Sequence, residues 1–481
     1  MNGQSSLSDF ERACQQTTDK MQREQIALAA LNFLLQNSLP NQASIEEEIY
    51  QEIEKESVNP SHVPSLPEGE FELNENLCAE LEARLADFFP TLTRLNSLTN
   101  PATALSLLAR ARIICQKVDT WRQYNYWTPL FDFLKNAASD QWRKWRSAAL
   151  AQQKARTAIG DAKFDSAKQF AIYGLQRLSG IPDHRLYLDL CSRVENALAE
   201  GDAYYCVAIA LGHWVVKESL VAGHYLRAAG MRHNLGNQLL ITGRNNEAIT
   251  VLEQNQQLCN DCWSLRDISF YYVNAFERLA CAYLNSGDAI RAADYFAKYE
   301  FYAQQPREQA LQRLGKGGLD MRNGTHAGAE QKYSEARQFA KGKDFFNFWM
   351  ACASRGWVCI FRDKPDEALA HVQEAISHGE TLTGFMNVDR RSYCFLLEAQ
   401  AQILRNELAL AQAALDSAET CMQGLDSPRR NMQLLLTKAS LRAPQGNNGE
   451  AQTYRDQAIQ LALTNGFDAS NLDRLKMAIF V

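Results

Sequence analysis

The chain has 481 residues, of which 46% are hydrophobic and 22% are charged, so it carries ample material for a large core. Its formal net charge of -6 at pH 7 argues against non-specific binding to duplex DNA, because proteins that bind the phosphate backbone carry an excess of basic side chains. No apolar run approaches the roughly 18 residues of a membrane helix, and Met1–Phe10 lacks the basic start and apolar core of a signal peptide, so we expect a cytoplasmic protein with no membrane partner.

The first 40 residues predict a single N-terminal helix. Apolar side chains recur at helical spacing between Asp9 and Gln36, after a polar start rich in serine and glutamine. Pro40 follows soon after this segment. A proline ends a helix because its ring fixes the backbone angle φ and its nitrogen has no hydrogen to donate.

Residues 41–72 differ in composition from their surroundings. Nine glutamates accompany a single lysine, and three prolines punctuate the second half of the segment. Because proline favours extended backbone and like charges repel, the segment is predicted to be an acidic, proline-containing linker in solvent. The alternative is an acidic arm that folds onto a basic face of the same chain and occludes it.

Residues 73–148 predict a small N-terminal helical bundle, with helical segments at 77–98, 101–117 and 121–137. Tryptophans gather near its end, interleaved with arginine and lysine. Trp142 and Trp145 stand three residues apart, a spacing typical of side chains that pack against the next helix. The same mixture also suits a surface that stacks bases and holds phosphates. The residues of this possible second surface are Trp121, Trp142, Trp145, Arg143 and Arg146.

One short pattern of small and large residues occurs twice between Asn234 and Tyr299. The first copy is Leu235, Gly236, Leu239, Gly243, Ala248 and Leu252, and the second is Leu279, Ala280, Tyr283, Gly287, Ala292 and Phe296. Small side chains let two helices approach closely while the large ones fill the seam between them. Each copy therefore predicts a helix, a tight turn at glycine and a second helix.

The small residue that opens the second helix returns eight times between residues 149 and 467. These positions are Ala167, Ala208, Ala248, Ala292, Ala329, Ala368, Ala411 and Ala451. In the last six copies a second small residue stands twelve positions earlier, at Gly236, Ala280, Gly317, Gly356, Ala399 and Ala439. Eight copies in phase predict eight stacked helical hairpins, followed by a capping helix over 468–481.

This pattern resembles the tetratricopeptide repeat (TPR), a helical-hairpin family defined by small and bulky residues at fixed offsets. The intervals here are 41, 40, 44, 37, 39, 43 and 40 residues, longer than the roughly 34 of the standard unit, so each helix is expected to gain about a turn. The resemblance implies an all-α fold, a right-handed superhelix whose first helices line a concave face. It also implies a role in binding proteins as an adaptor or scaffold.

The repeat phase predicts which side chains line that concave groove. The mixture is amphipathic, which suits a partner with apolar anchors and a few polar contacts. Packing between repeats is an equally good explanation for any single position, and a better one for Trp357. The predicted partner-binding residues are His233, Asn237, Asn274, Glu277, Arg322, Met350, Trp357, Tyr393 and Gln400.

No catalytic, cofactor or metal motif is recognised in the chain. The metalloprotease His-Glu-x-x-His pattern, the Gly-x-Ser-x-Gly elbow and the phosphate-binding loop are all missing. Twelve cysteines are scattered through helical patterns and are expected to be reduced and buried. Cys259 and Cys262 form one close pair, but a zinc site would need a second pair at suitable spacing.

These observations predict a non-catalytic adaptor or sensor that binds a partner polypeptide in the groove of the array and needs no cofactor or metal. The alternative is a regulatory subunit that recognises single-stranded nucleic acid or a small ligand and controls a separate effector.

Overall fold

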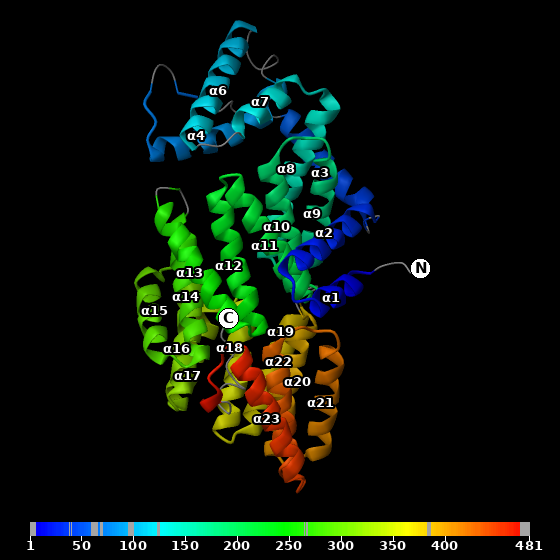
Figure 1. The fold of residues 1–481 in the computed structure, drawn as a ribbon, viewed down its shortest axis with the longest axis vertical. Helices are drawn as coiled ribbons and strands as arrows, with labels where there is room; N and C mark the ends of the chain where they lie inside the picture. Colours follow the sequence, from blue (N-terminus) through cyan, green and yellow to red (C-terminus); the bar gives the residue numbers. More distant parts are fainter. Residues whose placement is uncertain are drawn as a thin grey trace.

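The computed structural model describes residues 6–37, 39, 41–58, 66–67, 71–94, 101–122, 126–263, 265, 268–381 and 386–471. Over these residues the chain is helical, with no strand, and two short 3-10 helices, η1 and η2, complete the elements (Figure 1). The all-α, TPR-like solenoid predicted from the sequence is confirmed.

Eight hairpins of antiparallel helices follow one another along the chain. The first and second helices of each hairpin are α8 (Ser139–Gly160) and α9 (Phe164–Arg177), α10 (His184–Glu200) and α11 (Tyr205–Val221), α12 (Tyr225–Thr242) and α13 (Asn245–Asp261), α14 (Ile268–Ser286) and α15 (Ala289–Tyr302), α16 (Pro306–Arg322) and α17 (His326–Ala340), α18 (Phe345–Phe361) and α19 (Pro365–Glu380), α20 (Val388–Leu404) and α21 (Leu408–Met422), and α22 (Pro428–Arg442) and α23 (Asn448–Thr464).

The eight indexed alanines each lie in the second helix of a hairpin. Seven of them are 0% exposed, and Ala451 in the last hairpin is 6% exposed. The partner positions in the first helices are equally tight. A Cβ atom built on Gly236 would lie 2.4 Å from Leu252 Cδ2, and one on Gly317 would lie 2.5 Å from the Tyr333 ring. Small residues are therefore required where the two helices touch.

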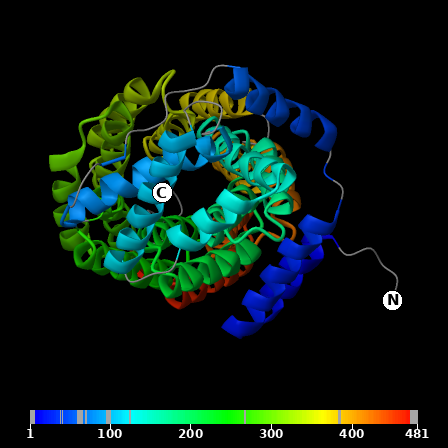
Figure 2. The same cartoon turned by 90° about the horizontal axis from the view of Figure 1, so that it is seen from above.

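The first helices form the inner layer of the array. Each first helix contacts the first helix of the next hairpin, whereas among the described residues no comparable contact joins successive second helices. In a curved stack the inner elements are the ones that lie closer together. Seen from above, the hairpins wind around a common axis (Figure 2).

The superhelix closes on itself, because the last hairpins and the residues after them contact the second, third, fourth and fifth hairpins. The carbonyl of Glu200, at the end of α10, accepts hydrogen bonds from Asn387 Nδ2 at 2.8 Å and Arg390 Nη1 at 3.0 Å. The amide of Asp468 donates to the Asn285 carbonyl at 3.0 Å. Three ion pairs join the same two regions, and we call them the clasp: Glu200 with Arg390, Arg244 with Asp426, and Arg322 with Asp468.

The N-terminal segment expected to be one helix is two. α1 (Leu7–Gln16) ends at Thr17, whose backbone is extended, and α2 (Lys20–Gln36) begins after Asp19. The Asp19 carboxylate accepts a hydrogen bond from the Gln22 amide at 2.9 Å. Such a side-chain cap stabilises a new helix start, which explains the break. Both helices pack on α11 of the second hairpin.

The first half of the segment expected to be a solvated linker is a helix, α3 (Gln42–Val58), so that prediction was wrong for these residues. Ile45, Ile49 and Ile53 recur every four residues and are 6%, 0% and 8% exposed, which gives the helix an apolar face. The residues 59–65 and 68–70 of the predicted linker lie outside the described residues.

The glutamates of α3 pair with basic side chains of the first hairpin. Lys154 on α8 donates to Glu48 at 2.7 Å and to Glu52 at 2.6 Å. Arg177 on α9 pairs with Glu46. The acidic segment therefore lies against a basic face of the same chain, as the alternative reading of its composition anticipated.

The N-terminal bundle lies at one end of the array (Figure 1). It contains α4 (Glu75–Phe88), η1 (Phe89–Arg94), α6 (Pro101–Arg122) and α7 (Trp127–Asn136). The first hairpin starts at Ser139, ten residues before the predicted boundary at 149, so Trp142 and Trp145 belong to the array. The predicted capping helix over 468–481 falls largely on residues outside the description, which ends with η2 (Ala469–Asn471).

The close contact between the two helices of a hairpin predicts different effects on stability when two glycines at the same repeat position are replaced by alanine. In Gly236→Ala the new Cβ would overlap Leu252, so we expect a loss of about 1–3 kcal/mol in the free energy of unfolding. In Gly356→Ala the new Cβ would meet no atom closer than 3.5 Å, and helix propensity should leave the stability equal or slightly higher. Thermal and urea unfolding of the two variants check this, and equal losses in both would contradict a steric seam.

The clasp predicts energetic coupling between the second and seventh hairpins, which the Glu200–Arg390 ion pair joins. The Arg390 and Glu200 side chains are only 6% and 14% exposed, so we expect a coupling energy of about 1–3 kcal/mol in a double-mutant cycle with Arg390→Met and Glu200→Gln. The control cycle uses Arg405 and Asp366, an exposed pair 3.6 Å apart, which should show almost no coupling. Equal coupling in both cycles would argue against a closed superhelix.

Candidate binding surface on the concave face

One face of α10 is open to solvent while the rest of the helix is packed. Its half-buried positions after the first turn are Asp189, Arg193, Asn196 and Glu200, which recur at intervals of three or four residues. Leu188, Leu190, Val194 and Leu198 between them are 0–1% exposed. Since α10 belongs to the inner layer, the open face points toward the superhelix axis.

The same kind of face continues on the next three first helices. The Tyr271 ring of α14 lies 6.3 Å from the His233 ring of α12, which shows that the open faces of neighbouring helices adjoin. We call the whole surface the concave strip. It consists of Asp189, Arg193 and Asn196 on α10, Arg227, His233 and Asn237 on α12, Tyr271 and Asn274 on α14, and Arg307 on α16.

Arg193 differs from the other arginines at this surface. Arg227 pairs with Asp189, and Arg307 Nε lies 3.2 Å from Asp344 Oδ2. Among the residues that the structure describes, Arg193 has no ion-pair partner, and its Nε is buried with no hydrogen-bond acceptor. Burial, followed by the nearby Arg227 charge, lowers the pKa of Arg193 from its ordinary value.

The lowered pKa of His233 also reflects an excess of positive charge at this surface. Burial lowers its pKa to about 3, and the charges of Arg278 and Arg307 lower it further in the same direction, so the imidazole is neutral at pH 7. The His233 Nδ1, Asn237 Oδ1 and Asn196 Oδ1 atoms are buried and find no hydrogen-bond partner within the described part of the chain. The concave strip thus offers polar atoms that the protein itself leaves unused.

Glu195 does not neutralise this surface. It is 0% exposed and accepts a hydrogen bond from Gln238 Nε2 of α12. Burial raises its pKa to about 8, so at neutral pH the carboxyl group is largely protonated.

Of the nine residues predicted to line the groove, three lie on the concave strip and six do not. His233, Asn237 and Asn274 lie on the concave strip and are half-buried. Glu277 is 3% exposed beneath the strip, 3.2 Å from Arg278 Nε, and Arg322 belongs to the clasp. Met350, Trp357, Tyr393 and Gln400 are between 0% and 5% exposed and lie inside the wall of hairpins six to eight.

Hairpins six to eight are closed on their inner side by large side chains. The Trp357 ring lies 6.1 Å from the Tyr393 ring, and the Arg430 guanidinium stands 4.6 Å over the same tyrosine. Arg430 also pairs with Asp389 at 2.9 Å, and both side chains are 4% exposed. The open part of the concave face therefore lies along hairpins two to five.

Sequence reasoning missed Asp189, Arg193 and Asn196. The groove positions were counted from the last six repeats, although the turns of the first two hairpins, 161–163 and 201–204, are close in length to those of hairpins five to seven. In the structure Ala162 and Ala203 of these turns adopt positive φ angles of 57° and 58°. Asp363 and Asn406 adopt the same geometry in later turns, and the alanine series that includes Ala208 was the signal from which the count could have been extended to α10.

The residues of the possible second surface do not share one environment. Trp121 is 45% exposed and Arg143 is exposed, whereas Trp142, Trp145 and Arg146 are 8%, 5% and 7% exposed. Trp145 Nε1 donates to Asp183 Oδ2 at 2.9 Å, at the start of α10. Burial of this kind suits packing between helices better than base stacking.

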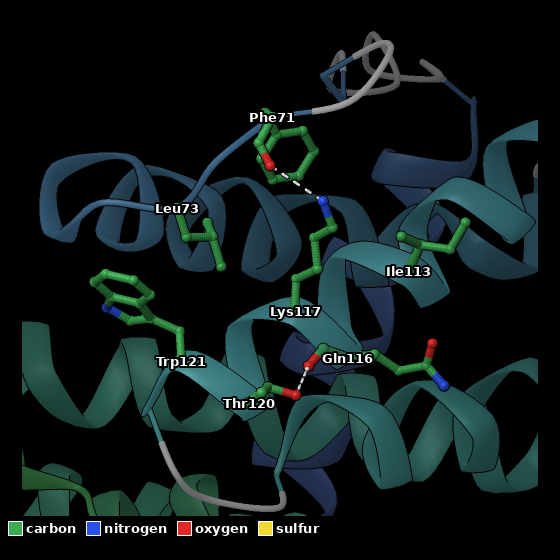
Figure 3. Close-up of a pocket in the computed structure, with 7 residues that line it drawn as sticks. All are labelled: Phe71, Leu73, Ile113, Gln116, Lys117, Thr120 and Trp121. Carbon is green, nitrogen blue, oxygen red and sulfur yellow. Dashed lines mark hydrogen bonds between the residues drawn. The ribbon is translucent and has the colours of Figure 1, made fainter.

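Trp121 lines an open pocket of about 790 Å³ between α6 and the segment before α4 (Figure 3). Lys117 Nζ donates to the Phe71 carbonyl at 3.1 Å and lies 4.3 Å from the centre of the Phe71 ring. The other lining residues are Leu73, Ile113, Gln116 and Thr120. Lys117 is the one titratable side chain among these seven residues, so the pocket lacks a matched acid and base.

The cysteines and the helices add two observations. Cys259 is buried, Cys262 is half-buried, and within the described ranges no three histidine, cysteine, aspartate or glutamate side chains gather as they would around a metal ion. Across the same residues no helix is both long enough and apolar enough to span a bilayer.

No family model matches the chain, and no curated protein matches it. Solved structures of helical-repeat proteins are similar to it. A tetratricopeptide repeat protein from Parabacteroides merdae is 12% identical over 58% of this chain and 98% of that one, with a TM-score of 0.36. The apo form of the quorum sensor NprR from B. thuringiensis is 12% identical over 79% and 98%, with a TM-score of 0.45. A signal transduction ATPase with a tetratricopeptide repeat sensor from Pyrococcus horikoshii is 12% identical over 95% and 69%, with a TM-score of 0.43.

Glu195 predicts a pH dependence of stability. Its pKa rises from an ordinary 4.5 to about 8 on folding, so the folded protein binds an extra proton between these values and loses stability as the pH rises through this window. Glu195→Gln mimics the protonated side chain. We expect its Tm to equal that of the wild type near pH 5 and to exceed it at pH 8.5. A difference that does not change with pH would show that Glu195 is ionised in the folded protein.

Proposed function

We propose that the protein is a non-catalytic adaptor or sensor that binds a segment of a partner polypeptide along the concave strip. The observation that carries the proposal is the contrast within the inner layer. Along hairpins two to five, the unpartnered atoms include those of half-buried side chains such as Arg193, His233 and Asn237, whereas in hairpins six to eight Trp357, Tyr393 and Arg430 are 0–3% exposed. A surface left open on an otherwise closed interior suits a ligand.

The side chains of the strip suit a polypeptide backbone. Asn196, Asn237 and Asn274 come from three consecutive first helices, and each amide can both donate and accept a hydrogen bond. An extended segment presents backbone N–H and C=O groups along its length, and amide side chains on successive repeats can meet them in turn. Tyr271 adds a rigid aromatic contact, which is typical of protein interfaces.

Recognition of single-stranded nucleic acid through the second surface has less support. Its two central tryptophans, Trp142 and Trp145, are 8% and 5% exposed and would have to leave their packing before a base could stack on them.

A pair of tryptophan substitutions tests the location of the site. Asn274→Trp fills the concave strip, whereas Ile290→Trp adds the same side chain to the outer helix α15, where Ile290 is 85% exposed. Peptides of twelve residues would be selected from a random display library on the wild-type chain. We expect the selected peptides to bind Ile290→Trp with unchanged affinity and Asn274→Trp at least tenfold more weakly. Equal binding to both variants, or failure to select any peptide, would contradict the proposal.

A further inference from the structure

Most basic side chains of the described array have an acidic partner. Lys154 and Arg177 are matched by the glutamates of α3, and Arg244, Arg322 and Arg390 are matched within the clasp. Arg193 is the exception on the concave strip. The nearest carboxylate on its own helix, Asp189, is already paired with Arg227, and Glu195 is largely protonated.

Side chains that carry hydrogen-bond donors lie around Arg193, including Tyr271, which is close enough to act on its charge. Asn196 lies one turn further along α10. Across the strip, a Cβ atom built on Gly230 of α12 would lie 3.0 Å from the Tyr271 hydroxyl, so the Tyr271 side chain reaches over α12 toward α10. His233, half-buried with an unpartnered Nδ1, stands beside the same tyrosine ring. The Arg193 guanidinium, the Tyr271 hydroxyl and the Asn196 side-chain NH2 group are donors of the kind that proteins use for carboxylates.

We propose that the segment bound on the concave strip is acidic, and that one of its aspartate or glutamate carboxylates pairs with Arg193. This inference rests on the proposed function and names the chemistry of the partner. A guanidinium held in a partly dehydrated site gains more from a carboxylate than it would in water, because the cost of removing it from water is already met in the free protein. The overall charge of -6 does not oppose this, since the local excess at the strip is positive.

The proposal makes a prediction about the free protein that a purely structural role would not. If Arg193 is an unmatched charge waiting for a ligand, then Arg193→Gln should raise the Tm of the chain without peptide, and the gain should shrink as salt screens the repulsion from Arg227. If Arg193 instead held the fold together, the same variant would lower the Tm.

The binding experiment uses three pools of fluorescein-labelled dodecamers with the same random apolar positions. The polar positions are Asp and Glu in the first pool, Ser and Asn in the second, and Lys and Arg in the third. We expect the acidic pool to bind the full chain at least tenfold more tightly than the neutral pool, by fluorescence polarisation in 0.15 M salt. Arg193→Gln should weaken the acidic pool by about 30-fold, and Arg193→Lys should restore part of the loss.

The matched control is Arg405→Gln, which removes an exposed arginine at the end of α20, away from the strip, and should change neither binding nor Tm. Equal binding of the neutral and acidic pools, or acidic binding that survives Arg193→Gln, would overturn this inference and leave the proposed function standing. Binding to none of the three pools would overturn both.

Discussion

The structure depends on the close approach of paired helices at small residues. Where Ala248 of one helix and Gly236 of its partner face the seam, no larger side chain fits, because Leu252 already occupies the space that a Cβ on Gly236 would need. In the last six hairpins a small residue stands at both positions, so the two helices of each hairpin pack closely, and the stacking of such hairpins gives the array its curvature. The curvature brings the last hairpins back to the earlier ones, where the clasp joins them to the second, third and fifth hairpins. The requirement for small side chains at the contacts between paired helices therefore helps to fix the shape of the groove.

Closure also explains why the inner surface is not uniform. An open solenoid would offer its whole concave face, but here the later hairpins fill their own interior with Trp357, Tyr393 and Arg430. The polar side chains of the concave strip come from α10, α12, α14 and α16. On this surface the His233 and Tyr271 rings of two neighbouring hairpins lie 6.3 Å apart, and Tyr271 is close enough to Arg193 of a third hairpin to act on its charge. Binding is then proposed where the fold has left charge and hydrogen-bonding atoms without partners.

The repeat could be predicted from the sequence because its positions are marked by small residues, and the size of a residue is known without the structure. Ala167 through Ala451 mark the second helices without any knowledge of tertiary contacts. The same reasoning placed Trp357 and Tyr393 on the inner side, but it could not tell that the superhelix closes and buries them, since the clasp joins residues such as Glu200 and Arg390 that are far apart in the chain. It also treated α3 as a linker because its glutamates outweighed Ile45, Ile49 and Ile53, whose spacing of four was the signal of a packed helix.

The central claim is that ligand contact is confined to the concave strip. Hydroxyl-radical footprinting of the full chain, alone and with its tightest selected dodecamer, tests this most directly because it reads each aromatic side chain separately. The account predicts slower oxidation of Tyr271 and His233 in the complex, with no change at Phe301 or Trp263, which are 77% and 53% exposed outside the strip. Protection of Phe301 or Trp263, with Tyr271 unaffected, would contradict it.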